Sequence, residues 1–221
     1  MRLRDKIVLI TSAQHPCTRA IAMGFAGEGA NCVVVDADGS KAEQIAAEVR
    51  SLGRLALPLQ FDITKKSQVE EVVRHTVAEF GRIDVLLNCS ALTYESDFLN
   101  FTEEAFNECI DRGPKAYFLT CQAVGRQMAG QRSGKIINLA TTDARIASGE
   151  STGNSAAYSS IESMTRAIAQ ALGYYGVNVN SFVCGPMDNF SGTAEEAGLT
   201  TWRTHRFSFP PHAAAQLTSL R

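Results

Sequence analysis

The sequence has no hydrophobic run long enough to cross a membrane and no run of five residues of like charge. A membrane-spanning helix needs about 20 consecutive apolar residues, whereas the apolar runs here have the length of β-strands. The 21 basic residues are balanced by 23 acidic ones, so the charge pattern is not that of a protein that binds nucleic acid or an anionic membrane surface. These absences predict a cytoplasmic protein that acts on a small-molecule substrate, with no nucleic acid and no membrane as partner.

Internal repeats, low-complexity tracts and linker-like stretches are also absent before about residue 190. A chain of 221 residues with 45% apolar content is long enough for one sizeable core and short for two domains. We therefore expect one domain, formed by residues 1–189, with residues 190–221 as an irregular C-terminal tail of the same domain.

Paired cysteine motifs are missing too. The sequence contains no CxxC pair and no His/Cys spacing of the zinc type. Scattered cysteines of this kind are typical of reduced thiols in a cytoplasmic protein. The six cysteines are Cys17, Cys32, Cys89, Cys109, Cys121 and Cys184.

The sequence does contain short apolar runs, rich in Val, Ile and Leu, that alternate with segments of helical period. The apolar runs cover residues 6–12, 31–36, 55–62, 84–89, 134–141 and 177–184. Strands that alternate with helices predict a mostly parallel sheet, and near-continuous apolar strands indicate helices on both of its faces. The predicted fold is α/β, with a single doubly wound sheet of the Rossmann type.

Three of the predicted helices bear on function. The first is expected to hold Pro16 in its first turn, where the missing N–H costs little. A long helix over about residues 102–130 is expected to kink or divide at Gly113 and Pro114. A third helix, over about residues 154–173, contains the sequence YSSIE, which sets a phenol one turn from a carboxylate.

In sheets of this kind, ligands bind beyond the carboxyl ends of the strands. Cys17, Cys89 and Cys184 all fall at this edge or at the start of the first helix, and His15 lies beside Cys17 in the sequence. Two alternatives are open. The thiols form a nucleophile or metal cluster, since a thiol at a helix N-terminus can have a lowered pKa, or they are small buried apolar residues, as isolated cysteines most often are.

Taken in order, the motifs along the chain resemble those of the short-chain dehydrogenase/reductase family over about residues 5–189. The matching motifs are TSAQHPCTRAIA after the first strand, FDIT, DVLLNCSA, GKIINLAT, the tyrosine of YSSIE, and VNVNSFVCGP. The resemblance implies a protein that binds NAD or NADP and moves a hydride between the nicotinamide and a carbonyl or alcohol. It also implies a catalytic tyrosine, a lysine four residues later, a serine that orients the substrate and an asparagine in a proton relay.

The family's tyrosine corresponds to Tyr158, but Glu162 stands at the lysine position. An ammonium group beside a phenol favours the phenolate, whereas a carboxylate disfavours it, so the acid/base couple of the family is weakened. If hydride chemistry persists, Glu162 would accept hydrogen bonds from the ribose hydroxyls or act as a base. The alternative is a solvated helix residue without a role.

The serine position corresponds to Thr141 or Thr142, whose hydroxyl would orient the substrate instead. Thr141 lies seventeen residues before the tyrosine, which is further than in the family, so Ser148 and Ser151 remain alternatives. The asparagine position falls on Gly113, which has no amide side chain.

The phosphate-binding loop departs furthest from the family. The three glycines of the TGxxxGxG pattern, which allow a tight turn and close approach of the pyrophosphate, correspond to Ser12, Pro16 and Thr18. The helix N-terminus keeps its dipole and some N–H groups. The side chains of Ser12, His15, Thr18 and Arg19 are expected to compensate by hydrogen bonding, and Thr11 is a further candidate for cofactor binding.

The positions that contact adenosine in the family are better matched. Asp36 ends the second strand, where a carboxylate would bind both ribose hydroxyls and repel a 2′-phosphate, so NAD is the cofactor implied. Asp62 and Ile63 match the position near the adenine, and Asn88 is the first residue of the stretch NCSA, which corresponds to the family's NNAG. The alternatives are a turn cap for Asp36 and bonding to buried backbone for Asn88.

The C-terminal residues do not match the family's last strand, because no β-branched run follows residue 189. We expect a sheet of six strands with the seventh missing. In the family that strand builds one oligomer interface and the long helices build another. A homodimer through the helices near 102–130 and 154–173 is therefore expected.

The first functional hypothesis is a divergent NAD-linked oxidoreductase that acts on a small carbonyl or alcohol substrate. The retained tyrosine and adenosine positions favour it. The altered loop, lysine and asparagine positions favour two alternatives: a non-redox enzyme, lyase-like or dehalogenase-like, on the same fold, or a catalytically inactive binding or assembly protein.

Overall fold

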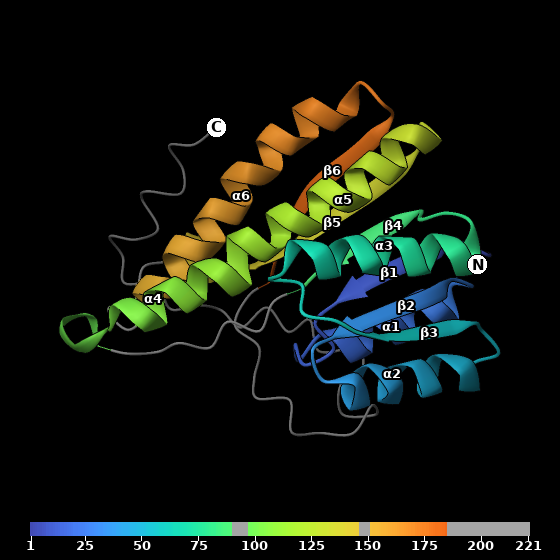
Figure 1. The fold of residues 1–221 in the computed structure, drawn as a ribbon, viewed down its shortest axis with the longest axis horizontal. Helices are drawn as coiled ribbons and strands as arrows, with labels where there is room; N and C mark the ends of the chain where they lie inside the picture. Colours follow the sequence, from blue (N-terminus) through green and yellow to red (C-terminus); the bar gives the residue numbers. More distant parts are fainter. Residues whose placement is uncertain (90–96, 146–150, 185–221) are drawn as a thin grey trace, which may run out of the picture. The chain divides into compact units, whose positions relative to one another are not determined.

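The computed structural model describes residues 1–89, 97–145 and 151–184. The chain divides into two units, Met1–Asp188 and Asn189–Arg221, and every described residue belongs to the first. This unit is built on a six-stranded parallel sheet with the strand order β3-β2-β1-β4-β5-β6 (Figure 1). The predicted doubly wound α/β fold is confirmed, and the direction of winding reverses between β1 and β4.

The elements alternate along the chain as the sequence predicted. The strands are β1 (Ile7–Thr11), β2 (Asn31–Asp36), β3 (Ala56–Gln60), β4 (Val85–Asn88), β5 (Gly134–Thr141) and β6 (Val177–Cys184). The α-helices are α1 (Thr18–Gly27), α2 (Gly39–Ser51), α3 (Lys66–Phe80), α4 (Glu103–Ile110), α5 (Ala116–Gln131) and α6 (Thr152–Gly173). Shorter helical segments are η1 (Phe98–Asn100), η2 (Asp111–Lys115) and η3 (Thr142–Ala144).

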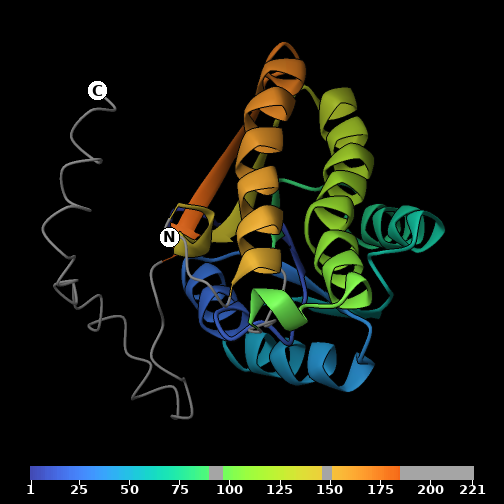
Figure 2. The same cartoon turned by 90° about the vertical axis from the view of Figure 1, so that its left-hand side faces the viewer.

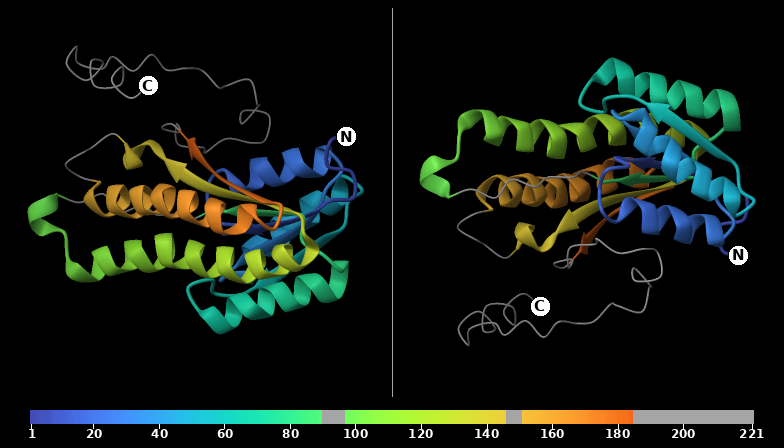
Figure 3. Two further views of the ribbon diagram at one scale, coloured as in Figure 1. Left: turned by 90° about the horizontal axis from the view of Figure 1, so that it is seen from above. Right: turned by 90° about the horizontal axis from the view of Figure 1, so that it is seen from below.

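The sheet separates two apolar cores, because successive residues of a strand point to opposite faces. Val8 and Ile10 of β1 pack with residues of α1 and α2 on one face. Ile7 and Leu9 pack with residues of α3, α5 and α6 on the other. The two helix layers can be followed in the views of Figure 3. Strands β1 and β2 are buried along their whole length, as near-continuous apolar strands require.

Helices α5 and α6 run side by side on the second face (Figure 2). The start of α6 approaches the preceding segments closely: a Cβ atom on Gly153 would lie 2.6 Å from the Phe101 ring and 2.7 Å from the sulfur of Cys109. Only glycine fits such a contact without displacement. The close contact sets the position of the turn that follows, which carries Tyr158.

Helix α1 begins after Pro16, which the sequence predicted to lie in its first turn. It starts at Thr18, and Pro16 precedes it. The chain after β1 first makes a tight turn, in which the His15 N–H donates to the Ser12 carbonyl (3.2 Å) and the Thr18 N–H to the His15 carbonyl (2.9 Å). These local bonds delay the helix, so the prediction that Pro16 occupies its first turn was wrong.

The expected break in the long helix is present. A π-helical turn, η2, joins α4 to α5, and within it Gly113 has the non-helical angles φ −91° and ψ −109°. Pro114 follows and has no N–H to donate to the helical ladder. The break turns α4 away from the axis of α5.

A buried network of polar side chains fixes β4, β5, α5 and α6 to one another. Asn88 donates through Nδ2 to Asn138 Oδ1 (2.9 Å) and accepts at Oδ1 from the Thr120 hydroxyl (2.8 Å). Asn138 in turn donates to the Thr165 hydroxyl (2.9 Å). Buried polar groups are costly unless they are hydrogen-bonded, and here they bond to one another. The side chain of Asn88 therefore serves the interior of the fold.

Several sequence predictions fall outside the described residues: the tail 190–221, the missing seventh strand and the alternative residue Ser148. The boundary between residues 189 and 190 stays a prediction. Within the described ranges, no helix is both long and apolar enough to span a bilayer.

Candidate functional site

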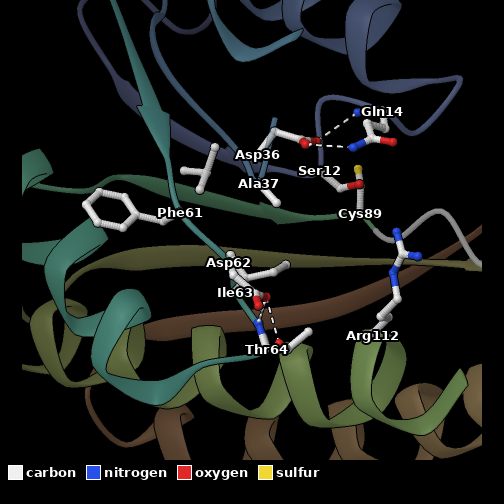
Figure 4. Close-up of a pocket in the computed structure, with 11 residues that line it drawn as sticks. Ser12, Gln14, Asp36, Ala37, Phe61, Asp62, Ile63, Thr64, Cys89 and Arg112 are labelled. Carbon is white, nitrogen blue, oxygen red and sulfur yellow. Dashed lines mark hydrogen bonds between the residues drawn. The ribbon is translucent and has the colours of Figure 1, made fainter. Parts of the chain in front are cut away.

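A pocket lies at the carboxyl edge of the sheet, next to the point where the strand order reverses (Figure 4). This is where open α/β sheets bind their ligands. The lining residues come from the ends of β1, β2, β3 and β4 and from η2: Ser12, Gln14, Val35, Asp36, Ala37, Phe61, Asp62, Ile63, Thr64, Cys89 and Arg112. Four of the predicted cofactor-binding residues, Ser12, Asp36, Asp62 and Ile63, are thus brought together.

Asp36 is held at the end of β2 by three N–H donors. Its Oδ2 accepts from the backbone N–H of Gln14 (3.1 Å), and its Oδ1 accepts from the Gln14 side-chain amide (2.9 Å) and the N–H of Asp38 (2.9 Å). Hydrogen bonds to a charged acceptor are stronger than neutral ones. The carboxylate is therefore fixed in place, and Oδ1 accepts two of the three bonds, one of them from the side-chain amide of Gln14.

Asp62 and Ile63 follow β3 on the opposite side of the pocket. Asp62 Oδ1 accepts from both the N–H (2.9 Å) and the hydroxyl (2.6 Å) of Thr64, while the Asp62 N–H donates to Gln68 Oε1 (2.6 Å). These bonds form the turn that leads into α3. They fix the peptide of Asp62 and Ile63 at the wall of the pocket.

Ser12 adopts the left-handed conformation, with φ 57°. This is the position of the family's first glycine, and non-glycine residues rarely have such angles because of a clash involving Cβ. The serine thus keeps the tight turn that glycine would provide. A strain of about 1 kcal/mol or more accompanies it.

The side chains of Thr18 and His15 fold into the loop. The Thr18 hydroxyl donates to the Ser12 carbonyl (2.7 Å), and His15 Nδ1 accepts from the N–H of Cys17 (3.2 Å). Both side chains are buried. Together with the backbone bonds of the turn, these contacts mean that the N–H groups of Gln14, His15, Cys17 and Thr18 all donate to atoms of the protein. These four N–H groups are thus bonded within the protein, whereas a phosphate-binding loop of the family presents such groups to the ligand.

Thr11 connects the ends of β1 and β4. Its hydroxyl donates to the Cys89 carbonyl (3.1 Å) and accepts from the Cys89 N–H (3.0 Å). Burial raises the pKa of the Cys89 thiol to about 12, although a hydrogen bond with Thr18 acts in the opposite direction. Cys89 is thus a neutral thiol at the floor of the pocket. Thr11 and Thr18 shape this floor from behind and do not line the pocket.

Arg112 reaches the pocket from η2, across from the Asp36–Gln14 pair (Figure 4). Its guanidinium pairs with Glu108 one turn earlier, at 3.1 Å, and both side chains are about half exposed. An exposed pair of this kind contributes little stability. The guanidinium is therefore available to a ligand at low cost, and among the described residues that line the pocket it is the one cation.

Tyr158 lies on the buried face of α6, with 2% of its surface exposed. It packs with Tyr117, Ala157 and Ile161. One turn earlier on the same helix, Asn154 is also buried, and its Oδ1 accepts no hydrogen bond from the described part of the chain. A buried acceptor without a donor costs about 1–3 kcal/mol, so this oxygen marks a position where a ligand or water would be bound.

Glu162 is neutralised by an arginine that the sequence did not single out. Arg145 donates through Nε and a terminal nitrogen to the two carboxylate oxygens, each at 3.2 Å. The Glu162 side chain is 12% exposed and the Arg145 side chain 62%. Arg145, which follows η3, thus sets a cation beside the carboxylate that stands at the family's lysine position. Glu162 is consequently not an isolated anion beside Tyr158.

Thr141 and Thr142 lie at the end of β5 and the start of η3. The Thr141 hydroxyl accepts from the N–H of Asp143 (3.3 Å) and so caps this short helix. Ser151, the alternative, is buried and its hydroxyl lies 3.3 Å from that of Ser155. The substrate-orienting role of Thr141 or Thr142 stays a prediction.

Sequence reasoning missed Gln14, Arg112, Arg145 and Asn154. Gln14 was within its reach, because it lies inside the loop whose glycine positions were compared. Arg145 bonds to Glu162 seventeen residues later, and Arg112 lines a pocket that other segments form. The buried oxygen of Asn154 is visible only in three dimensions. The part of the chain described here has no group of three or more His, Cys, Asp and Glu residues placed to hold a metal ion.

The comparison with known proteins agrees with the fold. Residues 6–199 match the family model described as short chain dehydrogenase. Galactitol 2-dehydrogenase of Agrobacterium fabrum is 33% identical over 203 residues, covering 91% of this chain and 78% of that protein. A 3-oxoacyl-acyl-carrier-protein reductase of Staphylococcus epidermidis is 31% identical over 183 residues, covering 82% of this chain and 75% of that protein. Among solved structures, NAD+-bound xylitol dehydrogenase superposes with a TM-score of 0.83 at 25% identity, over 85% of this chain and 73% of that one.

Proposed function

We propose that this chain, which belongs to the short-chain dehydrogenase/reductase family, uses NAD(H) to interconvert a small alcohol and the corresponding carbonyl compound. It is an oxidoreductase of the short-chain dehydrogenase type. The observation that supports a bound NAD(H) is the pocket itself, which is lined by the carboxylates at the ends of β2 and β3, Asp36 and Asp62.

The adenosine half of a nicotinamide dinucleotide fits this pocket. Family membership and the NAD+-bound neighbour indicate a nicotinamide cofactor. Asp36 would accept from the ribose hydroxyls, and its negative charge would repel a 2′-phosphate, which supports NAD rather than NADP. Ile63 would contact the adenine from the opposite wall. The bond from Gln14 to Asp36 must open for the ribose to bind.

The pyrophosphate half must be held differently from the family pattern. The loop N–H groups are already bonded within the protein, so they offer few donors to a phosphate. Arg112 would supply the positive charge from the other side of the pocket, because a guanidinium binds phosphate oxygens with two parallel N–H donors. The dipole of α1 adds a smaller contribution.

The bound nicotinamide would supply or accept the hydride. Tyr158 would give a proton to the substrate oxygen during reduction and take it back during oxidation. The Arg145–Glu162 pair would hold a ribose hydroxyl, with Glu162 as acceptor and the guanidinium as the cation near the phenol. Asn154 Oδ1 would accept a hydrogen bond from a water or from the substrate, in the role that Gly113 cannot fill.

Titration with NADH and NADPH, followed by calorimetry, tests the cofactor. We expect NADH to bind and NADPH to bind about tenfold or more weakly, because like charges brought together are costly. Asp36→Asn should narrow that difference, whereas Asp38→Asn, which only alters the cap of α2, should leave it unchanged. No binding of either cofactor at millimolar concentration would refute the proposal and favour the non-redox or binding alternatives.

The reaction is tested with galactitol and xylitol, the substrates named for two similar proteins, by the absorbance of NADH formed from NAD. Tyr158→Phe should abolish turnover while NADH still binds. Asn154→Leu should raise stability by removing the unpaired acceptor but lower turnover. Equal turnover in Asn154→Leu and the unchanged protein would remove Asn154 from the mechanism.

A homodimer through α5 and α6 and a cytoplasmic location complete the proposal. Phe118 on α5 is 45% exposed, and the outer face of α6 carries small exposed residues such as Ser160 and Ala167, which allow close helix packing. All six cysteines are thiols rather than disulfides, as in reducing compartments. Phe118→Glu should shift the protein towards monomer in sedimentation velocity.

A further inference from the structure

Two cysteines that are distant in the sequence form a pair beside the start of α1. Cys17 immediately precedes α1, and Cys184 is the last residue of β6. Their side chains are hydrogen-bonded to each other and belong to the same apolar cluster. Cys17 is partly exposed and Cys184 is buried. Cys17 is thus partly accessible from solvent, whereas its partner Cys184 is not.

The surroundings make the two sulfurs chemically unequal. The hydrogen bond with Cys184 lowers the pKa of Cys17 to about 5, with further lowering by a hydrogen bond and by the charge of His15, while burial acts in the opposite direction. The same hydrogen bond, followed by burial and the negative charge of Cys17, raises the pKa of Cys184. Cys89, which also interacts electrostatically with Cys17, has its pKa raised to about 12, chiefly by burial. At neutral pH the pair therefore holds one thiolate and one thiol.

We propose that Cys17 and Cys184 form an oxidisable thiol pair whose substrate is a hydroperoxide, with Cys17 as the attacking sulfur and Cys184 as the resolving one. The Cys17 thiolate attacks the terminal peroxide oxygen, an S–O bond forms, the O–O bond breaks, and the released alkoxide or hydroxide takes a proton. The Cys184 thiol then attacks the sulfur of the resulting sulfenic acid, loses its proton and displaces water as the S–S bond forms. In sum, two thiols and one hydroperoxide give one disulfide, one water and one alcohol, or a second water from hydrogen peroxide.

The bond would join the β1–α1 loop to the end of β6. Cys17 belongs to the loop that, in the proposed function, faces the pyrophosphate, so a change of NADH affinity on oxidation is an additional expectation that rests on that function. The thiol chemistry itself does not depend on it. The experiments that test the thiol pair therefore measure the reactivity and bonding of the two sulfurs and not the binding of NADH.

The pH dependence of alkylation identifies the attacking thiol. With a pKa near 5, Cys17 remains mostly thiolate at pH 5.5, and its rate with iodoacetamide should fall less than about 1.5-fold between pH 8.5 and pH 5.5. An ordinary thiol with a pKa of about 8.5 should lose about 500-fold over the same range. Because both rates are measured on the same thiol, their ratio does not depend on how accessible that thiol is. A single rate at neutral pH does not identify the thiolate, because thiolate nucleophilicity falls as the pKa falls.

Peptide mapping after treatment with one equivalent of hydrogen peroxide tests the pair. We expect the peptides of Cys17 and Cys184 to be joined and the other four cysteines to stay reduced. Cys184→Ser should leave Cys17 to stop at sulfenic or sulfinic acid, and Cys32→Ala, which removes a buried thiol elsewhere in the core, should still form the bond. Because mapping of the unchanged protein needs no variant, loss of folding in Cys184→Ser does not affect the test.

Two results would overturn the proposal. One is a peroxide-treated protein in which Cys17 is untouched, or is oxidised without a bond to Cys184. The other is an alkylation rate of Cys17 that falls with pH as an ordinary thiol does. Failure of NADH to bind would refute the proposed function but would leave both of these measurements, and this proposal, unaffected.

Discussion

Removal of the Gln14 side chain should tighten cofactor binding. The Gln14 amide donates to Asp36 Oδ1 at 2.9 Å, and that carboxylate is the group proposed to accept from the ribose hydroxyls. The amide and the ribose therefore compete for one oxygen. Gln14→Ala removes this competitor but keeps the backbone N–H of residue 14, which donates to Oδ2 at 3.1 Å. The carboxylate should stay in place and be ready for the ligand.

The size of the effect follows from the bond that must open. A hydrogen bond to a charged group contributes about 1.5–3 kcal/mol net, and this one is only partly buried, which places it at the lower end. Each 1.4 kcal/mol corresponds to about a tenfold change in dissociation constant. We therefore expect Gln14→Ala to bind NADH about tenfold more tightly than the unchanged protein.

Calorimetric titration of both proteins with NADH and with ADP-ribose measures this difference. ADP-ribose isolates the adenosine and pyrophosphate contacts from those of the nicotinamide. Gln60→Ala is the matched control, because Gln60 ends the neighbouring strand and its amide donates to the Ala37 carbonyl (3.1 Å) rather than to Asp36. An unchanged or weaker affinity in Gln14→Ala would mean that Gln14 turns to serve the ligand, and the competition argument would be wrong.

Three further predictions concern the charge pair, the loop and the interior. Glu162→Lys should lower the free energy of unfolding in urea by about 1 kcal/mol, since it sets an ammonium group beside Arg145. Combining it with Arg145→Glu should restore stability and raise the carbonyl-reducing rate. A double variant slower than the unchanged protein would contradict the proposed role of this pair. Ser12→Gly should leave stability unchanged or raise it by up to about 1 kcal/mol, because relief of the left-handed strain outweighs the added chain entropy; a lower urea midpoint would show that no strain is stored there. Asn138→Leu should cost about 2–4 kcal/mol, because it leaves two buried partners unsatisfied, whereas Asn180→Ala on an exposed part of β6 should stay within about 0.5 kcal/mol.

The sequence was sufficient for the fold because its signals are local and repeated. Six apolar runs alternate with helical segments, and each run became a strand of the parallel sheet within two residues at either end. The break at Gly113 and Pro114 was also local, because proline removes a donor wherever it stands in a helix. The start of α1 was missed since Pro16 is compatible with a first helical turn, and nothing local reveals that the carbonyls of Ser12 and His15 take the next N–H groups.

The sequence alone also predicted the edge of the sheet at which the pocket lies, since parallel strands all end on the same side and ligands of such sheets bind there. It placed Ser12, Asp36, Asp62 and Ile63 at that edge, and they line one pocket. Only the tertiary structure decided which groups those side chains bond to.

In the folded chain Asp36 bonds to Gln14, Glu162 to Arg145 and Cys17 to Cys184. The side chain of Asn88 lies in the interior. The reason is physical. Strand and helix formation depends on neighbours along the chain, whereas charge, pKa and hydrogen-bond partners depend on groups that are brought together only when segments seventeen or more residues apart pack.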